Sequence, residues 1–163
     1  MRRIRTAVIG AGFIGPAHVE AVRRLGCADV MVLAEVDPAV AEKKARMLGL
    51  SRFTSNIDEV LSDPDIDVVH VCTPNDLHYP VSKKALEAGK HVVCEKPLAR
   101  TLADAREMLD AAERAGIKLM YAELICFAPR YMRAKELMDE GAFGRVFQIK
   151  HGESHYGPHS DWF

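Results

Sequence analysis

Three glycines with the spacing Gly-x-Gly-x-x-Gly directly follow the apolar run Ile4–Ile9. Glycines at this spacing allow a tight turn, the close approach of a pyrophosphate, and close packing of a helix on a strand. Free backbone N–H groups at the start of the next helix then attract phosphate. The pattern indicates a dinucleotide site, and a glycine-rich turn without a ligand is the alternative. The cofactor-binding residues predicted in this turn are Gly10, Gly12, Phe13, Ile14 and Gly15.

One lysine, Lys96, stands between Glu95 and Pro97, directly after the apolar run 91–94. A lysine beside an oxidised nicotinamide meets a like charge and is partly desolvated, and both effects favour loss of its proton. Such a group can exchange a proton with a substrate hydroxyl during hydride transfer. We therefore predict that Lys96 is catalytic and lies near the cofactor. The plainer interpretation is a Glu-Lys pair on the protein surface.

A dinucleotide site also requires an acidic residue about 20 residues after the glycines, where it binds the ribose hydroxyls. Asp37 fits this place, and Glu35, two residues earlier, can point the same way because side chains alternate along a strand. A carboxylate repels a 2′-phosphate, and no arginine follows within the next several residues. NAD is therefore favoured, with NADP as the alternative. Asp37 can also cap the helix that Pro38 opens.

The apolar run 68–72 leads into a third polar motif, Thr73-Pro74-Asn75, with His78 three residues further on. We expect its backbone and hydroxyl groups to border the cofactor cleft. His78 lies near the start of a predicted helix, where a packing or capping role is the alternative to direct chemistry. The three motifs follow three apolar runs, and parallel strands would bring them to one edge of a sheet, where open α/β sheets bind ligands.

The elements that must position these motifs alternate between strand and helix patterns. We predict strands at Ile4–Ile9, 30–36, 52–54, 68–72, 91–94 and 118–121. Helices are predicted at 13–25, 38–48, 57–61, 77–88, 101–115 and 129–138, with N-caps at Asn56 and Thr101. Strands joined by helices of this length predict a doubly wound parallel α/β sheet of the Rossmann type. A further strand is predicted at 144–150.

The composition is that of a globular protein, with 163 residues, 48% hydrophobic and 28% charged. A net charge of −1 provides no basic surface for nucleic acid. No apolar stretch approaches the ~18–20 residues that span a bilayer, and no signal-peptide pattern is present. We expect a cytoplasmic protein that binds neither nucleic acid nor membrane. The four cysteines match no zinc motif, and glycine and proline interrupt the series His151, His155 and His159, so no metal is predicted.

Together, these motifs resemble those of the glucose-fructose oxidoreductase, inositol dehydrogenase and MocA (Gfo/Idh/MocA) family. The resemblance covers essentially the whole chain, and Glu95-Lys96-Pro97 combined with Thr73-Pro74-Asn75-x-x-His78 is its most specific part. It implies an NAD(P)-binding Rossmann domain with Lys96 beside nicotinamide and substrate. It also implies that Thr73, Pro74, Asn75, His78 and Glu95 lie along the cofactor cleft, and that Trp162 approaches the cofactor from a second domain.

Family members are usually about twice as long, and their second domain carries a catalytic Asp and His four residues apart. This sequence contains no match to that pair. We therefore expect a Rossmann domain at residues 1–122 and the beginning of a substrate and oligomerisation domain at 123–163, from a truncated protein. The full-length protein is expected to form a homo-oligomer.

The leading hypothesis is an NAD(P)-dependent oxidoreductase that transfers hydride between nicotinamide and a secondary alcohol of a sugar, polyol or related small molecule. A non-catalytic dinucleotide-binding module is the second hypothesis, and a structural fragment with an empty cleft is the third. Adenosyl-group methyl transfer can use such a sheet, but it gives no reason for Glu95-Lys96-Pro97.

Overall fold

The structure, a computed structural model, describes residues 2–152. The chain divides into two compact units, Met1–Glu123 and Leu124–Phe163. Within the described residues, no helix has the length and apolar character needed to cross a membrane.

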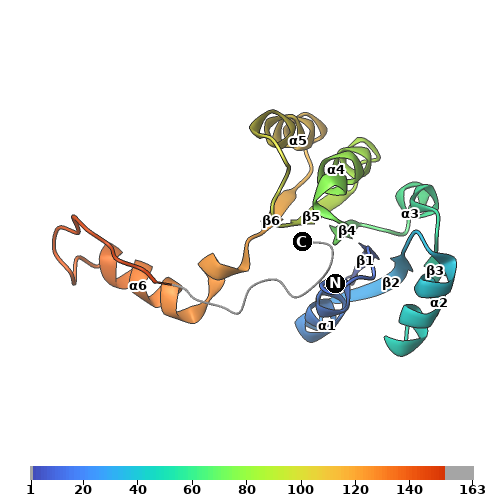
Figure 1. Cartoon of the computed structure of the whole chain (residues 1–163), viewed down its shortest axis with the longest axis horizontal. Coiled ribbons are helices and arrows are strands. Elements are labelled where there is room, and N and C mark those ends of the chain that lie inside the picture. Colours follow the sequence, from blue (N-terminus) through green and yellow to red (C-terminus); the bar gives the residue numbers. More distant parts are fainter. Residues whose placement is uncertain (1, 153–163) are drawn as a thin grey trace. The chain divides into compact units, whose positions relative to one another are not determined.

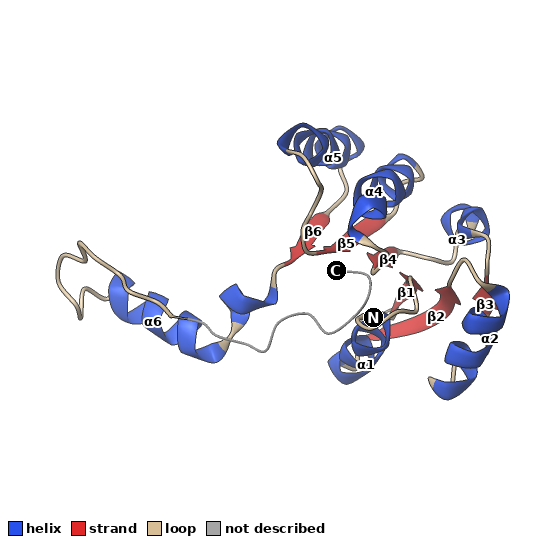
Figure 2. Cartoon of the chain, in the orientation of Figure 1, coloured by secondary structure: helices blue, strands red, loops and turns tan. Residues whose placement is uncertain are grey.

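The first unit is built on one six-stranded sheet in which every neighbouring pair of strands is parallel (Figures 1 and 2). The strand order is β3-β2-β1-β4-β5-β6, so the chain reverses its direction across the sheet between β1 and β4. This confirms the predicted doubly wound parallel sheet. The strands are β1 Ile4–Ile9, β2 Ala28–Ala34, β3 Phe53–Thr54, β4 Val68–Val71, β5 His91–Glu95 and β6 Leu119–Ala122.

Helices cover both faces of this sheet, with α1 and α2 on one side and α3, α4 and α5 on the other (Figure 1). A one-turn 3₁₀ helix, η1 (Asn75–Leu77), directly precedes α4. The α-helices are α1 Gly15–Leu25, α2 Pro38–Met47, α3 Ile57–Ser62, α4 His78–Glu87 and α5 Leu102–Ala115.

Side-chain caps explain where three of these helices begin. Asp37 accepts hydrogen bonds from the backbone N–H groups of Ala39 and Val40 at the start of α2. Asn56 caps α3, and the Thr101 hydroxyl caps α5 by accepting from the Asp104 backbone N–H, as the sequence predicts. By contrast, no side chain caps α1, which follows the glycine turn.

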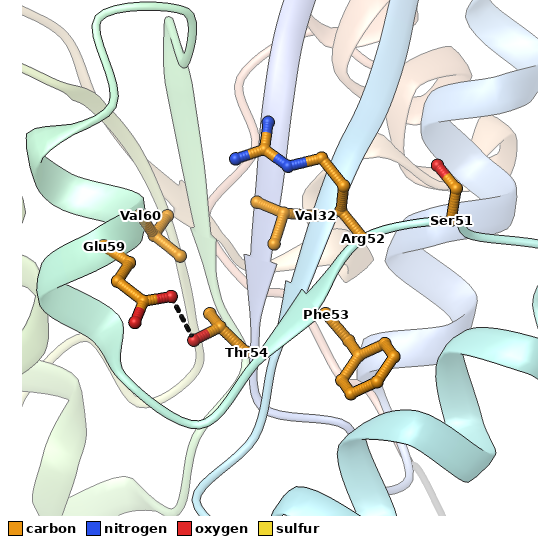
Figure 3. Close-up of a pocket in the computed structure, with 7 residues that line it drawn as sticks. All are labelled: Val32, Ser51, Arg52, Phe53, Thr54, Glu59 and Val60. Atoms are coloured by element: carbon orange, nitrogen blue, oxygen red, sulfur yellow. Dashed lines mark hydrogen bonds between the residues drawn. The ribbon is translucent and has the colours of Figure 1, made fainter.

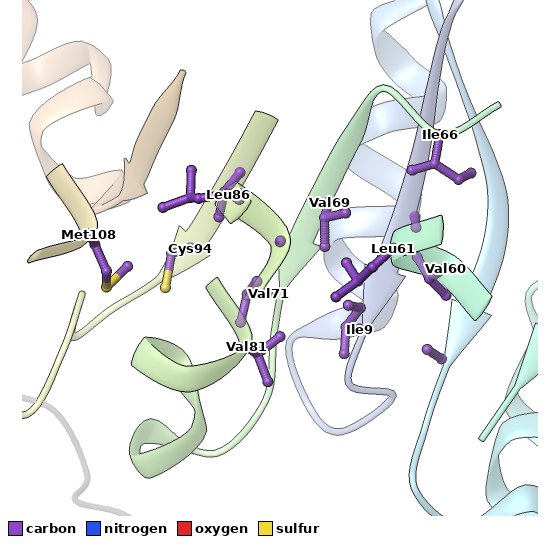
Figure 4. Packing of buried hydrophobic residues seen from close by; sticks show 14 of the residues in the cluster. Ile9, Val60, Leu61, Ile66, Val69, Val71, Val81, Leu86, Cys94 and Met108 are labelled. Atoms are coloured by element: carbon purple, nitrogen blue, oxygen red, sulfur yellow. The ribbon is translucent and has the colours of Figure 1, made fainter. Parts of the chain in front are cut away.

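The core lies on both faces of the sheet because adjacent strand residues point in opposite directions. On one face, Ala7 and Ile9 of β1 join a large cluster with residues of α3, α4 and α5, part of which Figure 4 shows. On the other face, Val8 packs with Val19 of α1 in a smaller cluster. This packing fixes α1 against the sheet directly after the glycine turn.

Ion pairs gather at the amino edge of the sheet, where β1 begins. Arg3 forms a two-point contact with Asp29, with Nε–Oδ2 and Nη2–Oδ1 distances of 2.6 and 2.8 Å. Asp67, just before β4, pairs with Arg2 and accepts the Arg5 backbone N–H at 2.8 Å. The Arg5 side chain also pairs with Asp65.

Buried Lys90 belongs to the same edge, directly before β5. Its Nζ donates to the backbone carbonyls of Asp63 and Ile66 at 2.6 and 2.9 Å. The amine therefore holds the loop before β4 against the start of β5.

Two predicted strands need correction. The second strand is displaced by two residues toward the amino terminus, to Ala28–Ala34, because its ladder with β1 ends at Ala34. The strand predicted at 144–150 is wrong, since the described structure has neither strand nor bridge there. A strand needs a neighbour to form its ladder, and no strand is assigned in the described part of the second unit. That part contains η2 (Leu124–Phe127) and α6 (Pro129–Asp139), close to the predicted helix at 129–138.

Candidate functional site

The glycine turn joins β1 to α1 at the carboxyl edge, where the strand order reverses. Gly10 has φ 101°, and a Cβ there would lie 2.4 Å from the Cys72 carbonyl oxygen after β4. At Gly15, a Cβ would lie 2.1 Å from the Gly10 carbonyl oxygen. The turn therefore packs tightly at both ends, at Gly10 against the segment after β4 and at Gly15 against its own backbone.

Gly12 is different because a Cβ built on it would meet no atom within 4 Å. The fold therefore has room for a larger side chain at this position. The middle of the turn is open and exposed, and the start of α1 has no side-chain cap. Backbone N–H groups near an uncapped helix start attract anions such as phosphate.

The two carboxylates after β2 have different surroundings. Asp37 is exposed and caps α2. Glu35 is partly buried, and its Oε2 accepts a hydrogen bond from the Ala11 backbone N–H, inside the glycine turn, at 2.8 Å. The structure thus brings Glu35 to the glycine turn, while the Asp37 carboxylate has the capping role that the sequence left open.

The loop after β4 combines exposed and buried groups. Pro74 and Asn75 are exposed, whereas the Thr73 hydroxyl oxygen is buried and has no hydrogen-bond partner among residues 2–152. His78 is fully buried, with Nε2 2.9 Å from the Thr73 carbonyl and Nδ1 2.6 Å from the Pro97 carbonyl. Both ring nitrogens of His78 are engaged, so this residue joins the loops after β4 and β5.

Lys96 directly follows β5 at the same edge and is exposed. The described residues provide no ion-pair partner for its ammonium group, and the Lys96–Pro97 peptide bond is cis. Its backbone is held from inside the protein, since its N–H donates to Glu95 Oε2 at 3.0 Å. The Lys96 backbone is therefore held by a hydrogen bond, whereas its ammonium group has no ion-pair partner among residues 2–152.

Next to Lys96 lies a chain of three titratable side chains, one buried and two partly buried, that spacing along the sequence did not reveal. Glu95 is only 5% exposed, and its Oε1 lies 3.0 Å from His18 Nε2 in the first turn of α1. His18 Nδ1 lies 3.0 Å from Nδ1 of His70 in β4. Burial, followed by repulsion from His18, lowers the pKa of His70 to about 4, so its ring is neutral at pH 7.

Exposed apolar side chains mark the loops around the glycine turn. The loops after β1, β2 and β4, three adjacent strands, each present one large hydrophobic residue. Phe13 is 87% exposed and Val36 is 85% exposed, and Leu77 is also exposed. These three side chains are therefore accessible to an apolar part of a ligand.

A separate hollow of about 240 Å³ lies beside β3 and α3 (Figure 3). The Thr54 hydroxyl donates to Glu59 Oε2 across this hollow at 2.7 Å. None of the predicted cofactor residues lines it. Its lining residues are Val32, Ser51, Arg52, Phe53, Thr54, Glu59 and Val60.

The predicted residues of the first unit all lie at the carboxyl ends of β1, β2, β4 and β5. These are the four central strands of the sheet, and β3 and β6 are its edge strands. Trp162, predicted to approach the cofactor, lies outside the described residues, as do His155 and His159. Within residues 2–152, no group of three or more His, Cys, Asp or Glu side chains is arranged to hold a metal ion.

Comparison with known proteins agrees with this geometry. The profile of the Gfo/Idh/MocA oxidoreductase family, described as having an NAD-binding Rossmann fold, matches residues 4–123. Levoglucosan dehydrogenase from Pseudarthrobacter phenanthrenivorans is 37% identical over 158 residues, covering 92% of this chain and 40% of the relative. Inositol 2-dehydrogenase/D-chiro-inositol 3-dehydrogenase from Lactiplantibacillus plantarum is 30% identical over 156 residues, covering 93% of this chain and 44% of the relative.

Among solved structures, levoglucosan dehydrogenase in complex with NADH and levoglucosan superimposes with a TM-score of 0.84 at 38% identity. The match covers 88% of this chain and 41% of that chain. This chain thus spans about 40% of the length of the relatives that it matches. The family profile covers most of the first unit, and the chain therefore belongs to the Gfo/Idh/MocA oxidoreductase family through its NAD-binding Rossmann-fold part.

Proposed function

We propose that residues 1–122 form a domain that binds NAD across the carboxyl edge of the sheet. The protein is then an NAD-dependent oxidoreductase acting on a secondary alcohol of a sugar, polyol or related small molecule, and forms a homo-oligomer. The observation that carries the proposal is the glycine turn at the strand reversal, packed tightly at Gly10 and Gly15 and open at Gly12.

The residues around this turn fit the separate parts of a dinucleotide. The open middle of the turn and the uncapped start of α1 suit the pyrophosphate. Glu35 is the carboxylate proposed to accept from the ribose hydroxyls, because it lies at the turn while Asp37 caps α2. The exposed side chains of Val36 and Leu77 offer an apolar surface to the adenine.

The redox end of the site is proposed to lie toward the loops after β4 and β5. The Thr73 hydroxyl is buried without a partner among residues 2–152, and Pro74 and Asn75 are the exposed residues of the same loop that a ligand can contact. We assign His78 and Glu95 to holding these loops, since both are buried and engaged. Phe13, Ile14 and Trp162 remain predicted cofactor contacts.

Bound NAD supplies the site with a hydride acceptor, and this chain supplies the proton chemistry. Lys96 is proposed to take the proton from the substrate hydroxyl during oxidation and to return it during reduction. Its exposed ammonium group is suited to this because no described carboxylate holds it in an ion pair. Relatives named for levoglucosan and inositol support the sugar or polyol class of substrate.

The proposal is tested by titrating the chain with NAD and NADP in a calorimeter. We expect micromolar affinity for NAD and weaker affinity for NADP, because Glu35 repels a 2′-phosphate. NADH formation across a panel of sugars and inositols then tests the activity. Failure to bind NAD would overturn the proposal, and binding without any turnover would favour a non-catalytic dinucleotide-binding module.

A matched pair of neutral variants separates the two acidic candidates. Glu35→Gln is expected to weaken NAD binding at least tenfold, because it removes the charge that attracts the ribose hydroxyls. Asp37→Asn is expected to leave NAD affinity within twofold, since asparagine is an equally good helix cap. The reverse result would return the ribose role to Asp37.

A further inference from the structure

The His18–Glu95 contact joins two parts of the proposed site that lie far apart in the sequence. His18 is in the first turn of α1, three residues after Gly15 of the glycine turn. Glu95 ends β5 and immediately precedes Lys96. The hydrogen bond between them therefore links the element that begins at the proposed pyrophosphate site to the strand that presents the lysine.

The two oxygens of Glu95 serve different partners. Oε1 faces His18 Nε2, and Oε2 accepts the Lys96 backbone N–H, both at 3.0 Å. An ionised carboxylate only accepts hydrogen bonds, so His18 Nε2 carries the hydrogen in this contact. Because Glu95 is buried, losing one partner would leave a charged oxygen without compensation and free the carboxylate to rotate.

His70 supports His18 from the opposite side. The two rings meet edge to face, with centroids 5.2 Å apart and an interplanar angle of 77°. A neutral His70 can donate or accept through Nδ1, so it satisfies His18 Nδ1 without competing as a cation for Glu95. This arrangement directs His18 Nε2 toward the carboxylate.

We propose that His18 is a positioning residue for Lys96, acting through the Glu95 carboxylate that fixes the Lys96 backbone. The functional consequence of this contact rests on the proposed function, which assigns Lys96 to the redox end of the site. His18 itself contacts no reacting atom in this proposal. Its effect is to keep the Lys96 backbone in a fixed position relative to the glycine turn.

The first part of the test uses the 163-residue chain without ligand and measures solvent exchange of the Lys96 amide proton by NMR. Glutamine at position 18 can place its amide nitrogen where His18 Nε2 lies, whereas asparagine can replace only Nδ1. We expect His18→Asn to speed exchange at least tenfold and His18→Gln to keep it within threefold. His91→Asn is the control, because His91 begins β5 at the opposite edge and binds the Lys118 backbone N–H.

The second part compares NADH with ADP-ribose, which lacks the nicotinamide ring. We expect His18→Asn to weaken NADH binding threefold to tenfold while ADP-ribose affinity stays within twofold. His18→Gln should restore NADH affinity. A general structural role would lower both affinities together and would show no rescue by glutamine, which would overturn the inference.

If His18→Asn does not fold, Glu95→Gln supplies the same information. It keeps the volume of the side chain but leaves one acceptor for two donors, so faster Lys96 amide exchange is expected. Unchanged exchange in Glu95→Gln would overturn the inference. Failure of the unaltered chain to bind either nucleotide would instead overturn the proposed function, while the amide measurement would still decide whether His18 holds Lys96.

Discussion

The amino and carboxyl edges of the sheet differ in whether their charged side chains are paired. At the amino edge, each of the three arginines around β1 has a carboxylate partner, and the Lys90 amine is enclosed by two carbonyls. At the carboxyl edge, Lys96 is exposed, and residues 2–152 provide neither an ion-pair partner for its ammonium group nor a hydrogen-bond partner for the buried Thr73 hydroxyl. The arginines at the amino edge are thus held in ion pairs, although Arg5 Nε has no hydrogen-bond partner in the described residues, whereas the Lys96 ammonium group at the carboxyl edge is exposed.

This difference indicates which substitutions affect stability and which affect ligand binding. Polar groups already paired within the protein contribute to folding, whereas unpaired groups beside an open turn are available to a ligand. The Glu95–His18–His70 chain is an exception at the carboxyl edge, because its polar groups are paired with one another and are at least partly buried. The following predictions test this contrast.

The largest effect is expected from Lys96→Met. Turnover should fall about 1,000-fold, within the range for loss of a general acid–base group, while NAD affinity changes by no more than about tenfold. Steady-state kinetics and calorimetry measure the two quantities. Lys118→Met, an exposed lysine just before β6 at the amino edge, is the control and should change neither. Unchanged turnover in Lys96→Met would remove this lysine from the mechanism.

Two glycine variants should separate folding from binding within one turn. Gly15→Ala places a methyl group 2.1 Å from the Gly10 carbonyl oxygen, and the free energy of unfolding should fall by about 3 kcal/mol. Gly12→Ala has open space and should change it by less than about 0.5 kcal/mol. NAD affinity of Gly12→Ala should nevertheless fall at least tenfold, because the methyl group blocks approach of the pyrophosphate. Urea titration and calorimetry would contradict this contrast if both variants behaved alike.

The partly buried His70 should make stability depend on pH. Its pKa is lowered from 6.5 to about 4 in the folded chain, so the unfolded chain binds more protons between these values. The stability is therefore complete above pH 6.5 and is lost as the pH falls toward 4. Between pH 7 and pH 5 the free energy of unfolding should drop by about 2 kcal/mol from this group. Urea titrations of His70→Asn should show a drop smaller by that amount, and an equal drop would contradict the prediction.

The smallest effect is expected at the amino edge. Asp67→Asn weakens the contact with Arg2 and with the Arg5 backbone N–H, so the free energy of unfolding should fall by about 1 kcal/mol. NAD affinity should stay the same, since Asp67 lies at the other end of the strands. A change in affinity would mean that the two edges are not independent.

Local patterns predicted much of this fold because each depends on neighbours in the sequence. The β1 bounds and the caps at Asn56 and Thr101 follow from apolar runs and from side chains that reach two or three residues ahead. The end of β2 was predicted two residues late, because Val36 extends the apolar run but lies outside the ladder and is exposed. Ladder ends depend on the neighbouring strand, which the run itself does not show.

The site was predicted in part for the same reason. The glycine turn and Lys96 were found because their motifs are contiguous, whereas the histidine chain joins residues separated by 52 and 77 positions. The choice between Glu35 and Asp37 also depended on tertiary structure, since both are acids after one strand. The structure distinguishes them, because Glu35 approaches Ala11 in the glycine turn while Asp37 caps α2.

The Lys90 contacts have a consequence for covalent chemistry. Lys90 is only 8% exposed, and its amine donates to two carbonyl oxygens, so it cannot present a lone pair to an acylating reagent while the fold is intact. Lys96 stands in solvent at the opposite edge and is open to the same reagent. Acylation of Lys90 would therefore report local opening of the loop before β4, and acylation of Lys96 would provide the accessible reference.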